Sequence, residues 1–208
     1  MTRLIGTSVE DIREAARLVL EGRLIAYPTD TVYGLGCNPF DVDAVDRLVR
    51  AKKRVKGSLP ILVSSLAGAE RVGEINEKSA ALASKFWPGP LTLVVPTRSS
   101  LPAKVTDNSQ LVGLRIPNHE TTRRLILESG GAIVGTSANI SGRPSLRTAE
   151  EVLREMNGRI DVLMDGGTTP LGRESTVLRI VGDEIKVLRE AAISRDDILK
   201  ALSVTRAC

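Results

Sequence analysis

The segment that decides the fold is Tyr27-Pro28-Thr29-Asp30-Thr31-Val32-Tyr33-Gly34-Leu35-Gly36. It follows a short apolar run, Leu24-Ile25-Ala26, which predicts a buried strand. A connecting loop needs only turn residues, whereas this one also carries hydroxyls, a carboxylate and aromatic rings. Open α/β sheets bind ligands at the ends of their strands, so the segment indicates a binding site.

The composition is typical of a globular protein. The 208 residues are 42% hydrophobic and 26% charged, and they contain no evident linker, repeat or low-complexity tract. We therefore expect a single domain over residues 1–208 with no additional C-terminal domain. Aromatic residues make up only 2%, which predicts an aliphatic core and disfavours a nucleic-acid module that stacks bases on aromatic rings.

Charge and cysteine content indicate which ligands and which kinds of site the protein can have. The net charge of +4 favours anionic ligands such as nucleotides, pyrophosphate or RNA, although a small basic excess also serves solubility alone. Cys37 and Cys208 lack metal-ligand spacing, which argues against a disulfide framework or a zinc site. The sequence shows neither a signal-peptide core nor an apolar run of membrane length, so we expect a cytoplasmic protein without membrane contact.

Hydrophobic periodicity predicts alternating helices and strands, followed by a hairpin. Ser8 to Asp11 and Thr148 to Glu151 match the capping box that opens a helix. We expect helices over residues 9–20, 43–53, 66–72, 78–86, 120–128, 148–156 and 194–202. We expect strands over residues 24–26, 60–64, 91–95, 112–116, 132–135, 160–164, 176–180 and 185–188. The predicted fold class is α/β, with a twisted mixed parallel and antiparallel sheet flanked by helices.

Lys52 and Arg54 form the first group with potential chemistry. They lie two residues apart where the second helix ends, so an unwinding backbone can direct both side chains at one phosphate or carboxylate. Cations at a helix C-terminus are also favoured by the helix dipole alone, which leaves a solvated cap as the alternative.

Ser137 and Asn139 form a second group, in the segment from Gly135 to Gly142. Hydroxyls and an amide at a strand end suit hydrogen bonds to a polar ligand. The segment misses the Gly-x-Ser-x-Gly elbow of serine hydrolases, and the single histidine, His119, precedes the serine. A thiol arrangement of Cys37, His119 and Asn139 lacks any local signature, so hydrolysis is disfavoured.

A third group is scattered: Arg115 at a strand end, Ser175 at the start of the hairpin, and Arg189 at its end. Together they would form an anion site, but sequence spacing does not show whether they converge or are separately solvated. The chain contains no phosphate-loop or dinucleotide-binding glycine motif and no metal-ligand cluster. Mg²⁺ would therefore arrive with nucleotide phosphates, and no dedicated metal site is expected.

Six motifs, in this order, resemble the YrdC-like family over about residues 10–195. They are Pro28 to Leu35, Lys52-x-Arg54, Trp87-Pro88-Gly89-Pro90-Leu91-Thr92, Arg115-Ile116-Pro117-Asn118-His119, Thr136-Ser137-Ala138-Asn139-x-Ser141-Gly142 and Ser175-Thr176-Val177. Members of this family are L-threonylcarbamoyladenylate synthases. The resemblance implies the family's fold with a concave basic cleft. It also implies the short form of the family, since longer members carry a second C-terminal domain.

The resemblance also implies an activity: threonylcarbamoyl-AMP and pyrophosphate would form from L-threonine, bicarbonate or CO2, and ATP. The product would serve N6-threonylcarbamoyladenosine modification of tRNA, with the downstream transfer machinery, and tRNA itself, as expected partners. By analogy, Lys52 and Arg54 would be catalytic, and Thr31, Tyr33, Arg54 and Arg115 would bind threonine and carbamate. Lys52, Ser137, Asn139, Ser175 and Arg189 would bind the nucleotide, while Asp30 would brace its loop.

The sequence departs from the family pattern mainly at Val55 to Pro60, where a proline usually follows the arginine. The residues after Ser175-Thr176-Val177 and after Arg189 differ as well. Two alternatives to the synthase remain: a non-catalytic RNA-binding module, and a paralogue that acts on a different carbamoyl-type substrate.

Overall fold

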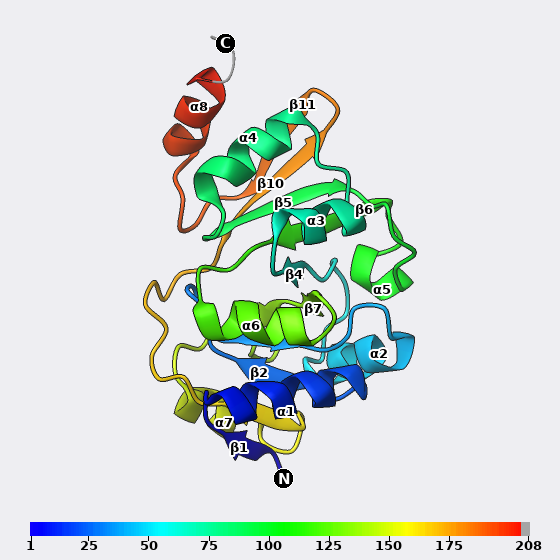
Figure 1. Cartoon of the computed structure of the whole chain (residues 1–208), viewed down its shortest axis with the longest axis vertical. Helices are drawn as coiled ribbons and strands as arrows, with labels where there is room; N and C mark the ends of the chain where they lie inside the picture. The colour runs from blue at the N-terminus through cyan, green and yellow to red at the C-terminus, as the bar shows by residue number, and fades with distance from the viewer. Residues whose placement is uncertain (205–208) are drawn as a thin grey trace.

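The protein, described here over residues 1–204 by a computed structural model, is a mixed α/β structure (Figure 1). Eleven strands lie within these residues: β1 Arg3–Ile5, β2 Ile25–Tyr27, β3 Gly34–Gly36, β4 Ile61–Val63, β5 Leu91–Pro96, β6 Leu111–Arg115, β7 Ala132–Val134, β8 Thr136–Ser137, β9 Val162–Met164, β10 Thr176–Val181 and β11 Glu184–Arg189. The helices of the same part of the chain are α1 Val9–Leu20, α2 Val42–Ala51, α3 Leu66–Val72, α4 Glu77–Phe86, α5 Ala103–Thr106, α6 Glu120–Glu128, α7 Ala149–Met156 and α8 Arg195–Val204.

The strands form two hydrogen-bonded sheets, each mixing parallel and antiparallel pairs. The five-stranded sheet has the order β1-β9-β2-β3-β8, and the six-stranded sheet has the order β11-β10-β5-β6-β4-β7. The predicted mixed sheet flanked by helices is thus confirmed, with its strands divided between two sheets. The expected 176–180 and 185–188 hairpin is β10 and β11, paired antiparallel at the edge of the larger sheet.

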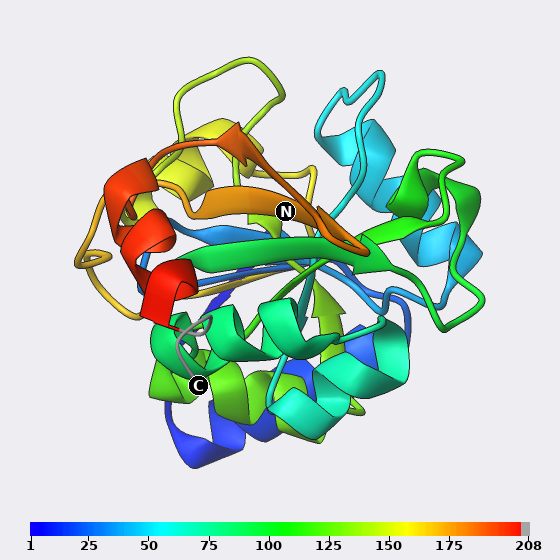
Figure 2. The ribbon, with the colours of Figure 1, turned by 90° about the horizontal axis from the view of Figure 1, so that it is seen from above.

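Four helices, α1, α6, α3 and α4, cover one side of the two sheets (Figures 1 and 2). Strand β5 shows how the two faces of its sheet differ, because successive side chains along a strand point to opposite faces. Leu91, Leu93 and Val95 are fully or almost fully buried in the core beneath these helices. Thr92 and Val94 point to the opposite face, which is left for the site described below.

Gly135 marks the place where one strand passes from the larger sheet into the smaller one. It lies between β7 and β8, and its amide donates to the Pro60 carbonyl at 2.8 Å. A Cβ at this position would approach the Leu62 side chain to 2.3 Å. Only a glycine fits, so the absence of a side chain here allows the two sheets to meet.

Each predicted helix and strand is confirmed, with ends that differ by at most two residues. Four elements were not predicted, and all are short: β1, β3, β8 and α5. Strand β3 lies inside the segment expected to be a loop. Gly34–Gly36 forms a strand because it pairs with β2 and β8, and it has no hydrophobic pattern of its own that would predict one. None of the helices within residues 1–204 has the length and apolar character needed to cross a bilayer.

Candidate active site

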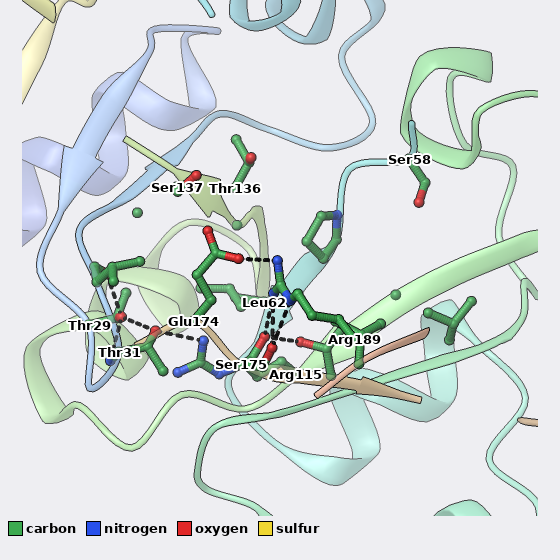
Figure 3. A pocket seen from close by; sticks show the side chains of 18 of the residues that line it. Thr29, Thr31, Ser58, Leu62, Arg115, Thr136, Ser137, Glu174, Ser175 and Arg189 are labelled. Atoms are coloured by element: carbon green, nitrogen blue, oxygen red, sulfur yellow. Dashed lines mark hydrogen bonds and ion pairs between the residues drawn. The ribbon is translucent and has the colours of Figure 1, made fainter. Parts of the chain in front are cut away.

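A cavity of about 290 Å³ lies on the sheet face opposite the four helices (Figure 3). Segments from both sheets and from three loops contribute to its wall. The polar lining residues are Thr29, Thr31, Tyr33, Arg54, Ser58, Thr92, Arg115, Thr136, Ser137, Glu174, Ser175 and Arg189. Three arginines and a single glutamate among these give the cavity a cationic excess. Such a lining suits an anionic, hydroxyl-bearing ligand.

Hydrogen bonds within the Thr29 to Val32 turn fix its shape. The Thr29 hydroxyl donates to the Val32 carbonyl at 2.7 Å and accepts from the Thr31 amide at 3.0 Å. Both threonines are buried, with exposures of 3% and 2%, yet their side chains border the cavity. These bonds hold the turn in one shape at the wall of the cavity, with the predicted residue Thr31 in it.

Tyr33 connects this turn to the Asp165 to Gly167 loop. Its hydroxyl donates to the Gly167 carbonyl at 2.9 Å and accepts from the Gly166 amide at 3.1 Å. Burial raises the pKa of Tyr33, so it stays a neutral phenol. With the hydroxyl engaged in this way, the ring is the part of Tyr33 available to shape the cavity.

Arg115, at the end of β6, is held at three points on its guanidinium. Its Nε donates to the Gly89 carbonyl and its Nη1 to the Thr31 hydroxyl, both at 2.9 Å, and Nη2 pairs with the Asp30 carboxylate. Burial lowers the pKa of Arg115, whereas the negative charge of Asp30 opposes that shift. The pair joins the opening segment to the larger sheet, which is the bracing role expected of Asp30.

Arg189, at the end of β11, lies on another side of the cavity. It pairs with Glu174, and its Nη2 donates to the Ser175 carbonyl at 2.9 Å. The Ser175 hydroxyl in turn lies 2.8 Å from that of Thr92 on β5. Arg189 and Ser175, separated in sequence, therefore converge as the anion-site interpretation required (Figure 3).

Arg54 is the third arginine, and its guanidinium stabilises the segment that departs from the family pattern. Its Nε donates to the Gly57 carbonyl at 3.2 Å and its Nη2 to the Ser58 carbonyl at 2.9 Å. Gly57 has φ of +94°, a left-handed conformation that favours glycine. The turn places Ser58 in the cavity wall beside Arg54.

Lys52 and Asn139 lie behind the wall and are not among the residues that line the cavity. Lys52 is 1% exposed, and its Nζ donates to the carbonyls of Ser137 and Asn139 and to Asn139 Oδ1. Burial, reinforced by Arg54, lowers the pKa of Lys52 to about 7. In this arrangement Lys52 holds the Ser137 to Asn139 segment in place.

Seven of the nine predicted site residues line one cavity: Thr31, Tyr33, Arg54, Arg115, Ser137, Ser175 and Arg189. The sequence did not single out Thr29, Thr92, Thr136 or Glu174 as site residues. Thr29, Thr92 and Thr136 stood inside quoted motifs, which was a usable signal. Glu174 had only its position next to Ser175, and the pairing of β10 with β5 brings it to the site.

Cys37 and His119 do not join the site. Burial raises the pKa of Cys37 to about 12, so its thiol is not ionised. His119 is the N-cap of α6, with Nδ1 3.4 Å from the Thr122 amide, as expected of a capping residue. No group of three or more His, Cys, Asp or Glu that could hold a metal occurs among residues 1–204.

Fold and site define a mixed α/β protein with a cationic, hydroxyl-lined cavity, and comparisons with known proteins identify its family. The family model described as "Telomere recombination", for Sua5, YciO and YrdC proteins, matches residues 17–191. The chain belongs to this family, which confirms the resemblance seen in the motifs.

Three curated relatives share the name threonylcarbamoyl-AMP synthase. "Threonylcarbamoyl-AMP synthase" of Pyrococcus abyssi is 41% identical over 94% of this chain and 58% of the relative. The protein of that name from Bacillus subtilis is 39% identical over 95% and 58%, respectively. The chain thus spans a little over half the length of these two relatives. The Idiomarina loihiensis protein of that name is 31% identical, and 96% of it is covered.

Solved structures agree with the architecture. The crystal structure of P. abyssi Sua5 complexed with L-threonine has a TM-score of 0.91 at 38% identity, covering 97% of this chain and 61% of that one. The structure of Escherichia coli YciO has a TM-score of 0.87 at 21% identity, covering 95% of this chain and all of that one, and it supports the fold alone.

Proposed function

We propose that this protein is an L-threonylcarbamoyladenylate synthase. The observation that carries the proposal is the convergence of Arg54, Arg115 and Arg189 with hydroxyl side chains in one cavity, in a chain of this family. The reaction would convert L-threonine, bicarbonate and ATP into threonylcarbamoyl-AMP, pyrophosphate and water. All substrates are anionic or zwitterionic and rich in oxygen, as the lining requires.

The chemistry asks for positioning and charge neutralisation more than for a nucleophilic side chain. Bicarbonate takes up a proton and releases water to give CO2. The neutral threonine amine then forms a bond to the carbon of CO2 and releases a proton, which gives a carbamate. A carbamate oxygen then forms a bond to the α-phosphorus of ATP, and the bond from that phosphorus to pyrophosphate breaks. Arginines beside the phosphates would stabilise the charge that develops on the leaving oxygen.

The side chains of the site divide into two proposed groups that share Arg54. Arg115 and Arg54 with Thr31 and Tyr33 would bind threonine and its carbamate. Arg54 would also bind phosphates, together with Arg189. These roles draw on side chains already held by neighbours, which lowers the cost of ordering them on binding. Ser137 and Ser175 would add hydrogen bonds to the nucleotide.

Lys52 and Asn139 would act from behind the wall. Since Lys52 Nζ binds the carbonyls of Ser137 and Asn139, it would keep the Ser137 hydroxyl in position. Mg²⁺ would enter with ATP, because Glu174 is the one carboxylate among the described lining residues and it already pairs with Arg189. The product would pass to the machinery that modifies tRNA, in the cytoplasm.

The test is product formation by the purified protein. Pyrophosphate release is measured with ATP, L-threonine and bicarbonate, and again with each of them omitted, while mass spectrometry identifies the adenylate. We expect release only with all three. Release that continues without threonine, or salt-sensitive RNA binding in the absence of any turnover, would overturn the proposal.

A further inference from the structure

We propose that the Glu174 carboxylate is the subsite for the ammonium group of a free amino-acid substrate. The inference rests on the proposed function, whose threonine substrate carries both a carboxylate and an ammonium. It assigns to Glu174 the task of distinguishing an amino acid from an acid that lacks the amine.

The cavity needs such a group because its other charged lining residues are cations. Arg54, Arg115 and Arg189 attract carboxylates and phosphates, but each of them repels an ammonium. Glu174 is the only carboxylate among the described residues that line the cavity. Among the charged side chains of this lining, only Glu174 therefore attracts the positive end of a zwitterion.

Glu174 is held in a fixed orientation from two directions. Its Oε1 accepts from the Ser145 hydroxyl at 2.6 Å, and its Oε2 accepts from Arg189 Nη1. Ser145 comes from the loop before α7, whereas Arg189 comes from β11, so the carboxylate links that loop to the end of β11. In Figure 3 the carboxylate points toward Arg189, and a dashed line marks their ion pair.

The carboxylate keeps capacity for a further donor. An ionised carboxylate offers about four lone-pair positions, and the two observed bonds use one on each oxygen. The side chain is 35% exposed, so it is reachable from the cavity without movement of the backbone. An ammonium, with three donors, can bind beside Arg189 without displacing it.

The experiment compares L-threonine with (2S,3R)-2,3-dihydroxybutanoate, in which a hydroxyl replaces the amine. Binding of both compounds is measured by calorimetry to wild-type protein and to Glu174→Gln, which keeps the size and removes the charge. For wild type we expect L-threonine to bind at least about tenfold more tightly, as for a hydrogen bond to a charged group. For Glu174→Gln we expect the preference to fall below about threefold.

A control separates the local charge of Glu174 from the net charge of the protein. Glu150→Gln removes an exposed carboxylate on α7 whose side chain is 82% exposed, and it should keep the wild-type preference. If Glu174→Gln fails to fold, the wild-type comparison still decides, because equal binding of the two compounds contradicts an ammonium subsite.

The outcomes distinguish this inference from the proposed function. Product formation without any preference for the amine, or a preference retained in Glu174→Gln, overturns the ammonium subsite alone. A preference abolished by Glu174→Gln, in a protein that releases no pyrophosphate, supports the subsite and overturns the synthase. A wild-type protein that binds no amino acid and forms no product overturns both.

Discussion

Asp30 and Arg115 form an ion pair whose side chains are only 6% and 7% exposed. Such a pair contributes little net stability by itself, because both charges lose their hydration. Removing one partner is different, since it leaves the other charge buried and uncompensated. The pair therefore fixes geometry: it keeps Arg115 directed at the cavity and holds the Pro28 to Gly36 segment against the larger sheet.

We predict that Asp30→Asn lowers the free energy of unfolding by about 3–5 kcal/mol, because a buried guanidinium loses its counter-charge. Urea unfolding followed by circular dichroism measures the change. Glu150→Gln is the matched control, since its ion pair with Arg154 is exposed and should contribute less than about 1 kcal/mol. A loss below 1 kcal/mol for Asp30→Asn would show that the pair does not hold the segment.

Lys52 gives a pH-dependent prediction, because burial lowers its pKa from 10.5 to about 7. Between these values the unfolded chain binds the proton and the folded chain releases it, so stability rises with pH across this window. This increase in the free energy of unfolding is complete above about pH 10.5, and it is lost as the pH falls through about 7. Relative to Lys52→Met, wild type should gain about 2 kcal/mol between pH 7 and pH 9.

Urea unfolding of wild type and Lys52→Met at pH 7 and pH 9 tests this prediction. The difference between the two proteins isolates Lys52 from every other titrating group. A difference that is the same at both pH values would mean that folded Lys52 keeps its proton, as its three acceptor contacts by themselves would favour.

Strand β3 shows how one short element depends on its glycines. Gly36 pairs with Ile25 of β2, and a Cβ on Gly36 would lie 2.2 Å from the Val134 carbonyl oxygen. That oxygen also accepts from the Tyr27 hydroxyl at 2.8 Å, so it is held in place. The backbones of β3 and β7, which belong to different sheets, therefore contact each other here with no room for a side chain.

We predict that Gly36→Ala destabilises the protein by at least about 2 kcal/mol, because neither backbone can move without breaking strand pairing. Gly68→Ala is the control: its Cβ would meet no atom closer than 3.4 Å, and alanine favours helix α3 by up to about 1 kcal/mol. Thermal unfolding of both variants measures the contrast. Equal melting temperatures would contradict the close approach.

The helices and longer strands were predictable because their signals are local. The Ser8 and Thr148 capping boxes lie at the starts of α1 and α7, and each includes both reciprocal hydrogen bonds. Strands β3 and β8 were missed because their pairing partners are distant in sequence or separated by turns. Gly34 pairs with Ser137, a contact that no pattern within either segment encodes.

The molecule as a whole brings distant residues to one cavity, from Thr29 near the start to Arg189 near the end. Loops on either side of the larger sheet frame this face in Figure 2, with the helices on the other side. An anion that bridges these segments should stabilise the entire fold, because it binds only when all of them are assembled.

We predict that pyrophosphate raises the melting temperature by about 5–10 °C at a hundred times its dissociation constant, from about 2.7 kcal/mol of binding free energy. The shift should shrink in Arg54→Gln and Arg189→Gln and persist in Arg154→Gln, whose side chain is 73% exposed on α7. Differential scanning fluorimetry measures it. An equal shift in all three variants would mean that pyrophosphate binds elsewhere.

The sequence by itself determined the mixed α/β class, the positions of the main elements, the family and seven of the residues that line the cavity. These features depend on local periodicity, capping and contiguous motifs. Only the tertiary structure decided that Lys52 and Asn139 support the wall from behind, that Glu174 enters the cavity, and that Asp30 pairs with Arg115. Those outcomes depend on burial and on partners more than 80 residues away for Lys52 and Asp30, which a linear pattern does not encode.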